Sequence, residues 1–368
     1  MKIKVNTEEL KSAVQEVIPA LAAKAESSTK VYEFIHISTH QDTVVFRCFN
    51  MYMQIETKLS ATVEEEGEML VPGKLFAEIV AKLPKDETTL EKTDETAKIK
   101  SGSMNMKLQT LPASSFEGIS VSSSDNTIKI QEVVLKKMIL QTSPFALQDN
   151  TRPILKGVLV EVIDDELKMV AMEPLKFAMR KEKVINESKQ SSSIIITSKL
   201  LENAARVLSE SNENISLIFS KQSLTIETAK TTIIMLKLDG NYLDYKAFLP
   251  ANYVTRVRLS RKEFISVAER AYLVARDDKK NTVKMIFEDG KVTVIVDNEI
   301  GSVNDSAEAF ITGSSITICF NIKNFLDVVK IVEDDDIIFE MTVPRSPCVV
   351  KPVDGEGFLY LVLPMIVN

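Results

Sequence analysis

The chain of 368 residues contains only two histidines and three cysteines, and it has no tryptophan. Histidine is the usual proton shuttle and metal ligand of proteins, so its scarcity argues against a His-based catalytic triad. His36 and His40 both lie in the alternating stretch VYEFIHISTHQDTVVF, which is typical of a β-strand and not of a zinc-binding helix. Cys48, Cys319 and Cys348 are odd in number and widely spaced, which favours reduced core thiols over a disulfide framework.

Glycine is also scarce, with 11 residues, and no glycine motif for phosphate or dinucleotide binding is complete. The nearest approach to a phosphate loop begins at Gly67, has one intervening residue too many, and carries Leu75 where Ser or Thr must bind magnesium. Gly355 and Gly357 lack the third glycine of a dinucleotide fingerprint, because Tyr360 stands in its place. We therefore predict a protein with no cofactor, no bound metal and no catalytic residues.

The acidic run Glu333–Asp336 leaves one catalytic alternative open. Dispersed carboxylates, including Asp334 to Asp336, could hold magnesium in a nuclease or a phosphotransferase. The run lies between an amphipathic segment and the strand-like IIFEMTV, so a solvated loop explains it more simply. A magnesium titration would distinguish the two interpretations.

The net charge of −7 and the pI near 5.3 exclude a polycation that coats nucleic acid or anionic lipid through its overall charge. Any DNA contact must come from a local basic face. The first residues, MKIKVNTEELKSAV, have no apolar signal-like run. The apolar stretch LYLVLPMIV is about half as long as a membrane span and contains Pro364. We expect a cytoplasmic protein without a membrane segment.

An internal repeat is the most informative feature of the sequence. Three segments, 69–116, 194–250 and 316–364, each show an apolar strand, a helix start, an amphipathic helix, an acidic loop and alternating strands. The helix starts are Gly73, Ser198 and Asn321. Similar amphipathic helices begin at the apolar residues Leu10, Leu135 and Phe264 and lead into paired strands.

The chain thus contains three tandem copies of a helix-strands-helix-strands unit, an α+β class. The repeats span residues 1–124, 125–251 and 252–368, and each is large enough to hold its own core. We call them the first, second and third repeat. Because strand edges at both chain ends invite pairing and repetition favours symmetric closure, we expect a ring.

The helices differ in charge from the rest of the chain. Six predicted helices, at 8–24, 73–85, 132–147, 198–208, 262–276 and 321–330, together carry +5, although the whole chain carries −7. Their cations include Lys11, Lys24, Lys74, Lys82, Lys136, Lys137, Lys199, Arg206, Arg270, Arg276, Lys323 and Lys330. A solvated helix face remains one interpretation. The other is that equivalent helices line one surface, which would attract phosphates without reading bases.

Four further stretches resemble the motifs of one family. They are Thr151-Arg-Pro-Ile-Leu-Lys-Gly-Val-Leu159, Asp239-Gly-Asn-Tyr-Leu-Asp-Tyr245 followed by Leu249-Pro250, Phe358-Leu-Tyr-Leu-Val-Leu-Pro-Met365, and Leu111-Pro-Ala-Ser-Ser-Phe116. Over its whole length the chain resembles the bacterial sliding clamp, the beta subunit of DNA polymerase III. The resemblance implies three clamp domains per chain and a homodimeric ring, with helices lining the inside and sheets outside.

The family's function is implied in the same way. A sliding clamp encircles duplex DNA without regard to sequence and confers processivity on DNA replication. It tethers the DNA polymerase III catalytic subunit and other proteins that carry a short apolar clamp motif, and a separate clamp loader places it on DNA. It is an accessory subunit without catalytic residues.

The resemblance also assigns residues to three surfaces. The partner-peptide cleft would be formed by Leu155, Met172, Leu175, Phe177, Leu243, Phe248, Leu361, Leu363, Pro364 and Met365. The DNA-facing positions would be Lys24, Lys74, Gln148, Arg152 and Lys199. The dimer interface would join Met106 and Leu108 to Tyr272 and Leu273, head to tail. From the residues alone, the apolar C-terminal tail is either a core strand end or a partner site.

The sequence departs from the family at the cleft. Where the family commonly has Thr-Asp-Gly-His-Arg-Leu, this chain has Met172-Glu-Pro-Leu-Lys-Phe177, which introduces apolar groups and a rigid proline. Leu243 replaces a usual proline, and the tail continues past Met365. The alternatives are therefore a diverged clamp paralogue with another motif preference, or a repeat scaffold that binds proteins but not DNA.

Overall fold

A computed structural model describes residues 1–22, 30–84, 87–119, 125–276 and 281–366. The chain divides into two compact units. The first unit holds residues 1–139, 162–165 and 183–238, and the second holds residues 140–161, 166–182 and 239–368. In the described part of the chain, no helix is long and apolar enough to cross a membrane.

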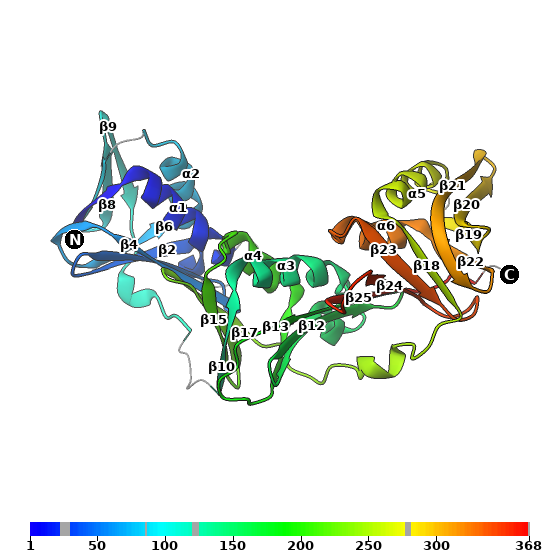
Figure 1. The fold of residues 1–368 in the computed structure, drawn as a ribbon. Helices are drawn as coiled ribbons and strands as arrows, with labels where there is room; N and C mark the ends of the chain where they lie inside the picture. The colour runs from blue at the N-terminus through cyan, green and yellow to red at the C-terminus, as the bar shows by residue number, and fades with distance from the viewer. Residues whose placement is uncertain (23–29, 85–86, 120–124, 277–280, 367–368) are drawn as a thin grey trace. The chain divides into compact units, whose positions relative to one another are not determined.

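The first unit is built from two antiparallel sheets and the helices that cover them (Figure 1). One sheet has the order β5-β1-β7-β8-β9, and the other has the order β10-β15-β16-β17-β4-β3-β2-β6. The strands are β1 (Lys2–Asn6), β2 (Phe34–His40), β3 (Thr43–Phe49), β4 (Met53–Ser60), β5 (Thr62–Glu65), β6 (Glu68–Pro72), β7 (Glu87–Thr93), β8 (Thr96–Ser101), β9 (Met104–Gln109), β10 (Asn126–Gln131), β14 (Ser192–Thr197), β15 (Asn214–Phe219), β16 (Ser223–Glu227) and β17 (Thr231–Leu236).

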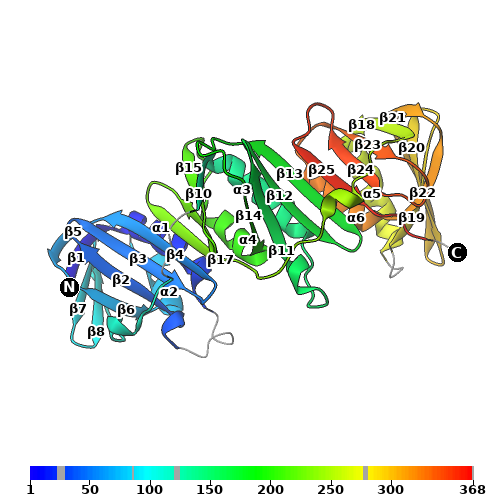
Figure 2. The same ribbon diagram turned by 90° about the horizontal axis from the view of Figure 1, so that it is seen from below.

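The helices that begin in the first unit each start directly after a strand. They are α1 (Thr7–Val17), α2 (Gly73–Ala81), α3 (Glu132–Thr142) and α4 (Ser198–Val207). The carboxamide oxygen of Asn6 accepts hydrogen bonds from the backbone N–H groups of Glu8 and Glu9, which caps α1. In Figure 2, β2, β3 and β4 lie in front of α1, so this helix covers one face of their sheet.

The second unit continues the same plan. It contains the strand run β12-β13-β25-β24-β23-β18-β21-β20-β19-β22. The strands are β11 (Gly157–Ile163), β12 (Glu166–Glu173), β13 (Lys176–Lys183), β18 (Thr255–Ser260), β19 (Thr282–Glu288), β20 (Lys291–Asn298), β21 (Gly301–Gly313), β22 (Ile316–Asn321), β23 (Asp336–Met341), β24 (Cys348–Pro352) and β25 (Phe358–Val362). The helices α5 (Arg261–Ala275) and α6 (Ile322–Ile331) lie on one face of this sheet (Figure 1).

An aromatic cluster forms the core of the third repeat. Phe264 on α5 and Phe325 on α6 meet Phe320 and Phe339 from the sheet, with ring centroids 4.7–5.9 Å apart. All four rings are fully buried, and their edge-to-face angles are those that aromatic quadrupoles favour. Phe264 is one of the apolar residues that marked the repeat in the sequence, and its equivalents Leu10 and Leu135 are also buried.

Three helices are shorter than predicted, and a proline follows the end of each. The helix predicted at 73–85 stops at Ala81, ahead of Pro84. The helix predicted at 8–24 stops at Val17, where a 3₁₀ turn containing Pro19 follows. The helix predicted at 132–147 stops at Thr142, before a 3₁₀ turn containing Pro144. Proline lacks the N–H that an α-helix needs and clashes with the preceding turn. Lys24 therefore does not belong to α1, and it lies outside the described residues.

Both histidines lie on β2, as the alternating pattern predicted. His36 is buried, stacks on Phe116 with 4.9 Å between ring centroids, and places Nε2 3.1 Å from a carboxylate oxygen of Glu68. His36 pairs across the strands with Arg47, whose guanidinium binds Glu56. Burial lowers the pKa of His36, and the cation of Arg47 acts in the same direction.

The lowered pKa of His36 predicts an acid-sensitive first repeat. The unfolded chain takes up the proton at a higher pH than the folded chain, so the free energy of unfolding falls as the pH drops through about 6.5. His36→Gln should reduce this loss, whereas His40→Gln, at an exposed site, should not. Urea unfolding between about pH 7.5 and 5.5 measures the difference. Equal pH slopes for all three proteins would contradict the assignment.

Candidate functional site

The repeats are joined by pairs of antiparallel strands. Within the first unit, β17 of the second repeat pairs with β4 of the first repeat, with Thr231 opposite Thr57 and Met235 opposite Met53. Within the second unit, β25 of the third repeat pairs with β13 of the second repeat, with Phe177 opposite Leu361. We call these strand pairs the first and the second joint. In each, the last strand of one repeat completes the sheet of the repeat before it.

The second joint brings several predicted cleft residues together. The backbone N–H of Leu363, just past β25, donates to the carbonyl of Leu175 at 3.0 Å. Phe177 is buried, and its ring centroid lies 5.9 Å from that of Tyr245. The 3₁₀ turn Tyr245–Phe248 therefore lies beside the joint, so that Phe248 comes from the chain segment next to the paired strands.

The chain before this turn is fixed by two contacts. Gly240 has a φ of +136°, and a Cβ at this position would approach Ile154 to 2.9 Å, so a side chain is excluded there. The hydroxyl of Tyr242 lies 3.3 Å from the carbonyl of Val170 and 3.4 Å from that of Gly157. Leu243 follows directly, between the half-buried Tyr242 and the turn. The sequence did not single out Tyr242 or Ile154 for this positioning role.

The predicted cleft residues fall into three groups by exposure. Leu155, Met172, Phe177 and Leu361 are buried, and Leu363, Pro364 and Met365 are half-buried. Three apolar side chains remain exposed, namely Leu175 at 38%, Leu243 at 40% and Phe248 at 56%. Exposed large apolar side chains on neighbouring segments are typical of a docking surface. The tail is thus a core strand in β25 and a more exposed segment after it.

A half-buried cation, Lys176, lies among these residues. Lys176 binds Asp327 of α6 at 2.7 Å and Glu173 at 3.1 Å, and its ammonium lies 5.7 Å from the ring centroid of Phe145. Burial lowers the pKa of Lys176, but the hydrogen bond that its ammonium donates to Asp327 and the two carboxylate charges outweigh this effect, so the pKa is raised. The segment Met172–Phe177, in which the sequence analysis had noted apolar groups and a proline, therefore also contributes ion pairs. Asp327 is too distant in sequence for any local pattern to reveal this pairing.

Four of the five predicted DNA-facing residues are described, and each is exposed. Lys74 lies in the first turn of α2, and Lys199 lies in the first turn of α4. Gln148 and Arg152 lie on the loop that follows α3. The helix cations are partly neutralised, since Lys11 binds Glu8, Lys136 binds Glu210, Arg270 binds Asp305 and Lys330 binds Glu269.

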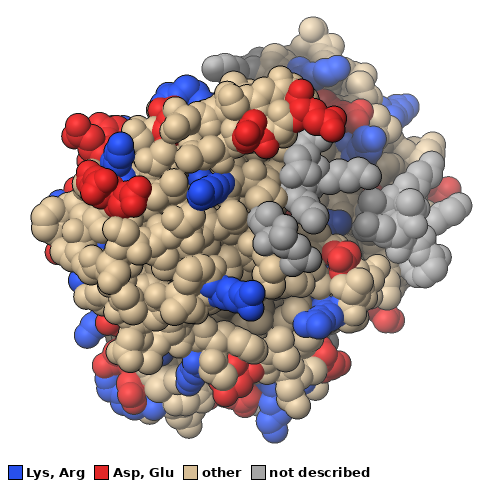
Figure 3. All heavy atoms as spheres, turned by 90° about the vertical axis from the view of Figure 1, so that its right-hand side faces the viewer, with Lys and Arg blue, Asp and Glu red and all other residues tan. Residues whose placement is uncertain are grey.

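Figure 3 shows one face of the molecule, on which basic and acidic side chains are mixed. Basic side chains also pair with the acidic run Glu333–Asp336. Asp336 begins β23 and binds Arg258 at 2.8 Å, and Asp335 faces Lys262 at 3.7 Å. Among the described residues, no group of three or more metal-binding side chains is found.

The predicted interface residues lie on the edge strand β9 and on the helix α5, which packs against β21. β9, which carries Met106 and Leu108, is the last strand of its sheet, and Met106 is 37% exposed. β21 pairs with β20 over Gly301–Glu308 but with β18 only over Ala309–Gly313. Among the described strands, the first half of β21 therefore has one unpaired edge. Tyr272 and Leu273 on α5 line a pocket of about 600 Å³ between α5 and α6, and Leu273 is 58% exposed.

Models of one family match nearly the whole chain. The N-terminal domain of the DNA polymerase III beta subunit matches residues 1–120, the central domain matches 129–244, and the C-terminal domain matches 246–366. The fold is thus that of three tandem clamp domains, the class of accessory subunits called sliding clamps. The chain belongs to the DNA polymerase III beta subunit family.

Individual relatives agree with the family models. The chain is 27% identical to the Beta sliding clamp of Bacillus subtilis, covering 99% of both chains. It is 27% identical to the Beta sliding clamp of Staphylococcus epidermidis, over 89% of this chain and 88% of the relative. Crystal structures of the sliding clamp from Bacillus subtilis and of the beta subunit from Thermotoga maritima superpose with TM-scores of 0.95 and 0.92, both with 26% identity and full coverage.

Proposed function

We propose that two copies of this sliding clamp close head to tail into a ring around duplex DNA. The ring tethers the DNA polymerase III catalytic subunit, and a clamp loader places it on DNA. In this proposal the chain has no catalytic residues, works in the cytoplasm, and is organised as clamp domains 1–124, 125–251 and 252–368. The observation that supports ring closure is the strand joint. The chain forms two such joints, and β9 and β21, the strands that a third joint would pair, each keep an unpaired edge among the described strands.

Matching hydrogen bonds define which residues of the repeats are equivalent. At the first joint the N–H of Leu236 donates to the carbonyl of Tyr52 at 2.8 Å, as Leu363 does to Leu175 at the second joint. Past these strands, the N–H groups of Leu111, Leu238 and Met365 donate to the carbonyls of Leu70, Ile195 and Cys319, respectively. Leu111, Leu238 and Met365 are therefore equivalent, and the strands that end just before them are β9, β17 and β25. β9 is thus the first repeat's counterpart of β17 and β25.

The partner strand in the third repeat follows from its hairpin. Asn50 accepts hydrogen bonds from the N–H groups of Tyr52 and Met53, and Asn298 accepts them in the same way from Ile300 and Gly301. β21 is therefore the counterpart of β4. A third joint would pair β21 with β9 of the partner subunit, and the register of the first joint carries over to it. Val303 would lie opposite Met106 of the partner subunit, as Ile55 lies opposite Ile233.

The register predicts which substitutions open the ring. Met106→Lys should shift the equilibrium from dimer to monomer at low micromolar concentration, because it buries an unpaired charge in the third joint. Phe310→Lys is the matched control, since Phe310 is 71% exposed on the part of β21 that β18 already pairs. Sedimentation velocity measures the masses. A dimer that persists in Met106→Lys would contradict the proposed register.

The exposed apolar side chains beside the second joint form the proposed docking cleft for clamp-motif proteins. Phe248→Ala or Leu363→Ala should weaken binding of a short apolar clamp-motif peptide at least about tenfold, because central apolar anchors dominate such interfaces. Phe310→Ala, distant from the second joint along the sheet order, should leave binding unchanged. Calorimetric titration measures the constants. Unchanged affinity in both cleft variants would move the docking site elsewhere.

The ring hypothesis makes DNA retention topological. Loaded onto a nicked circular duplex, the clamp should stay bound at high salt, since counterion-dependent contacts weaken there but an encircling ring cannot leave. Cutting the circle should release it by sliding off the ends. Release from the intact circle at high salt would favour ionic contact alone. Absence of loading in the presence of a loader would favour the alternative scaffold that binds proteins but not DNA.

A further inference from the structure

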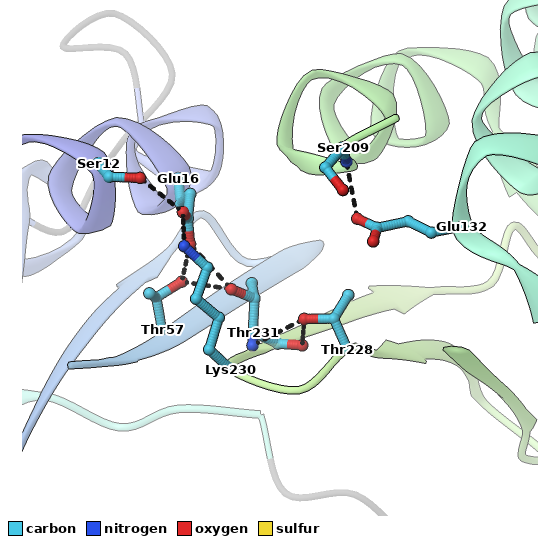
Figure 4. A network of polar contacts seen from close by, with 8 residues as sticks. All are labelled: Ser12, Glu16, Thr57, Glu132, Ser209, Thr228, Lys230 and Thr231. Carbon is cyan, nitrogen blue, oxygen red and sulfur yellow. Dashed lines mark hydrogen bonds and ion pairs between the residues drawn. The ribbon is translucent and has the colours of Figure 1, made fainter. Parts of the chain in front are cut away.

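The first joint contains a nearly buried carboxylate that is fully satisfied (Figure 4). Glu16 of α1, whose side chain is 14% exposed, accepts hydrogen bonds from Thr57 of β4 at 3.1 Å and from Thr231 of β17 at 2.9 Å. Lys230, just before β17, binds its other oxygen at 2.5 Å. The two threonine hydroxyls lie 3.0 Å apart. One carboxylate thus connects both strands of the joint and pairs with a cation from the incoming strand.

The same helix position carries a different chemical group at each joint. At the same distance from Leu10, Leu135 and Phe264 along their helices lie Glu16, Gln141 and Arg270. Gln141 is neutral and buried, and its side-chain amide donates to the carbonyl of Ile331 at 3.2 Å. Its backbone carbonyl accepts from the hydroxyl of Tyr360 on β25 at 3.1 Å.

In the third repeat the position is cationic. The Nε of Arg270 donates to Asp305 of β21 at 2.6 Å, and this bond lowers the pKa of Asp305. The hairpin equivalence makes Asp305 the counterpart of Thr57. In the ion pair of the third repeat, the carboxylate therefore lies on the strand β21 and the cation lies on the helix α5. At the first joint the carboxylate of Glu16 lies on the helix α1.

The incoming strands differ in a complementary way. The carbonyls of Lys230 and Gly357 accept from the N–H groups of Lys58 and Lys181 at 2.9 Å, so these two residues are equivalent. The counterpart of Lys230 before β9 is Ser103, and the counterpart of Thr231 is Met104. The segment with β9 therefore has no cation at the position of Lys230 and no hydroxyl at the position of Thr231. The segment with β17 has both groups.

From these differences we propose that the side chains Glu16, Gln141 and Arg270 specify which strand docks at which joint, reserving β17 for β4 and the partner's β9 for β21. This specificity rests on the proposed ring. If β17 of another copy docked on β21, Lys230 would face Arg270, a cation already paired with Asp305, in place of the carboxylate that it binds at the first joint. If β9 docked on β4, Glu16 would be buried without the cation and hydroxyl that satisfy it, which is costly. Mispaired and domain-swapped assemblies are therefore disfavoured, because similar interfaces are told apart by unfavourable contacts in the wrong pairings.

Two grafts test this rule. The acidic graft, Arg270→Glu with Asp305→Thr, copies Glu16 and Thr57 into the third joint. The basic graft, Ser103→Lys with Met104→Thr, copies Lys230 and Thr231 onto β9. Each graft alone should weaken the dimer at least about tenfold, since the acidic graft leaves a carboxylate unpaired and the basic graft opposes Arg270 with a second cation. The combined grafts should restore the dissociation constant to within about threefold of the wild type, because together they rebuild the first joint's network.

Sedimentation equilibrium of the full chain over a range of concentrations measures the dimer dissociation constants. Urea unfolding of the single grafts and the wild type is measured at a concentration at which all of them are monomeric. Equal midpoints show that a graft weakens pairing without destabilising the fold. Phe310→Lys, a cation added on β21 outside the joint, should leave the constant within about twofold of the wild type. If the wild type is dimeric and the two graft losses simply add, the charge rule is wrong and the ring stands. A monomeric wild type would overturn the ring and this rule together.

Discussion

The antiparallel strand joint is the constraint on which the rest of this molecule depends. A sheet edge exposes unpaired N–H and C=O groups, and a protein must pair, cover or close such edges. Here each repeat ends in a strand that completes the sheet of the repeat before it, β17 on β4 and β25 on β13. These two joints pair the strand edges where the repeats meet. Among the described strands, β9 and the first half of β21 each keep an unpaired edge. In the proposed ring, a second copy of the chain would supply the strand that each of these edges lacks.

The second joint also supports the proposed partner site. β25 forms the second joint, and directly after it the chain passes through Leu363, Pro364 and Met365, among the proposed cleft residues. The ion pair from Lys176 to Asp327 and the contact of Phe177 with Tyr245 stiffen the same place. A peptide docking there would contact a surface whose shape is set by the strand pairing. The cleft therefore needs no mobile element of its own to be formed.

Much of the fold could be predicted from the sequence, because its signals are local and occur three times. The starts of α2 and α4 at Gly73 and Ser198 agree with the structure, and Asn321 caps α6 in place of beginning it. Helix ends were less predictable, since the amphipathic pattern runs on past Pro19 although the helix cannot. The domain limits and the cleft, DNA-facing and interface residues remain predictions.

The polar contacts at the joints could not be predicted, because they join residues far apart in sequence. Glu16 meets Thr231 and Lys230, and Lys176 meets Asp327, only after the strands have paired. In the sequence Glu16 is simply a charge on an amphipathic helix and Thr231 an ordinary strand residue. The internal repeat is what gives them meaning, since comparison of equivalent positions separates the shared architecture from what differs between the joints.

The most direct test of the account is a cysteine pair across the third joint. Val303→Cys combined with Met106→Cys places the two sulfurs on facing residues of neighbouring subunits, whereas native Cys48 and Cys348 are buried. Mild oxidation should give a covalent dimer of about twice 41.1 kDa that remains on a nicked circle in denaturant. The pair Phe310→Cys with Met106→Cys should give no such product. Failure of the first pair to cross-link, or equal cross-linking of the control pair, would contradict the closure of the ring through β9 and β21.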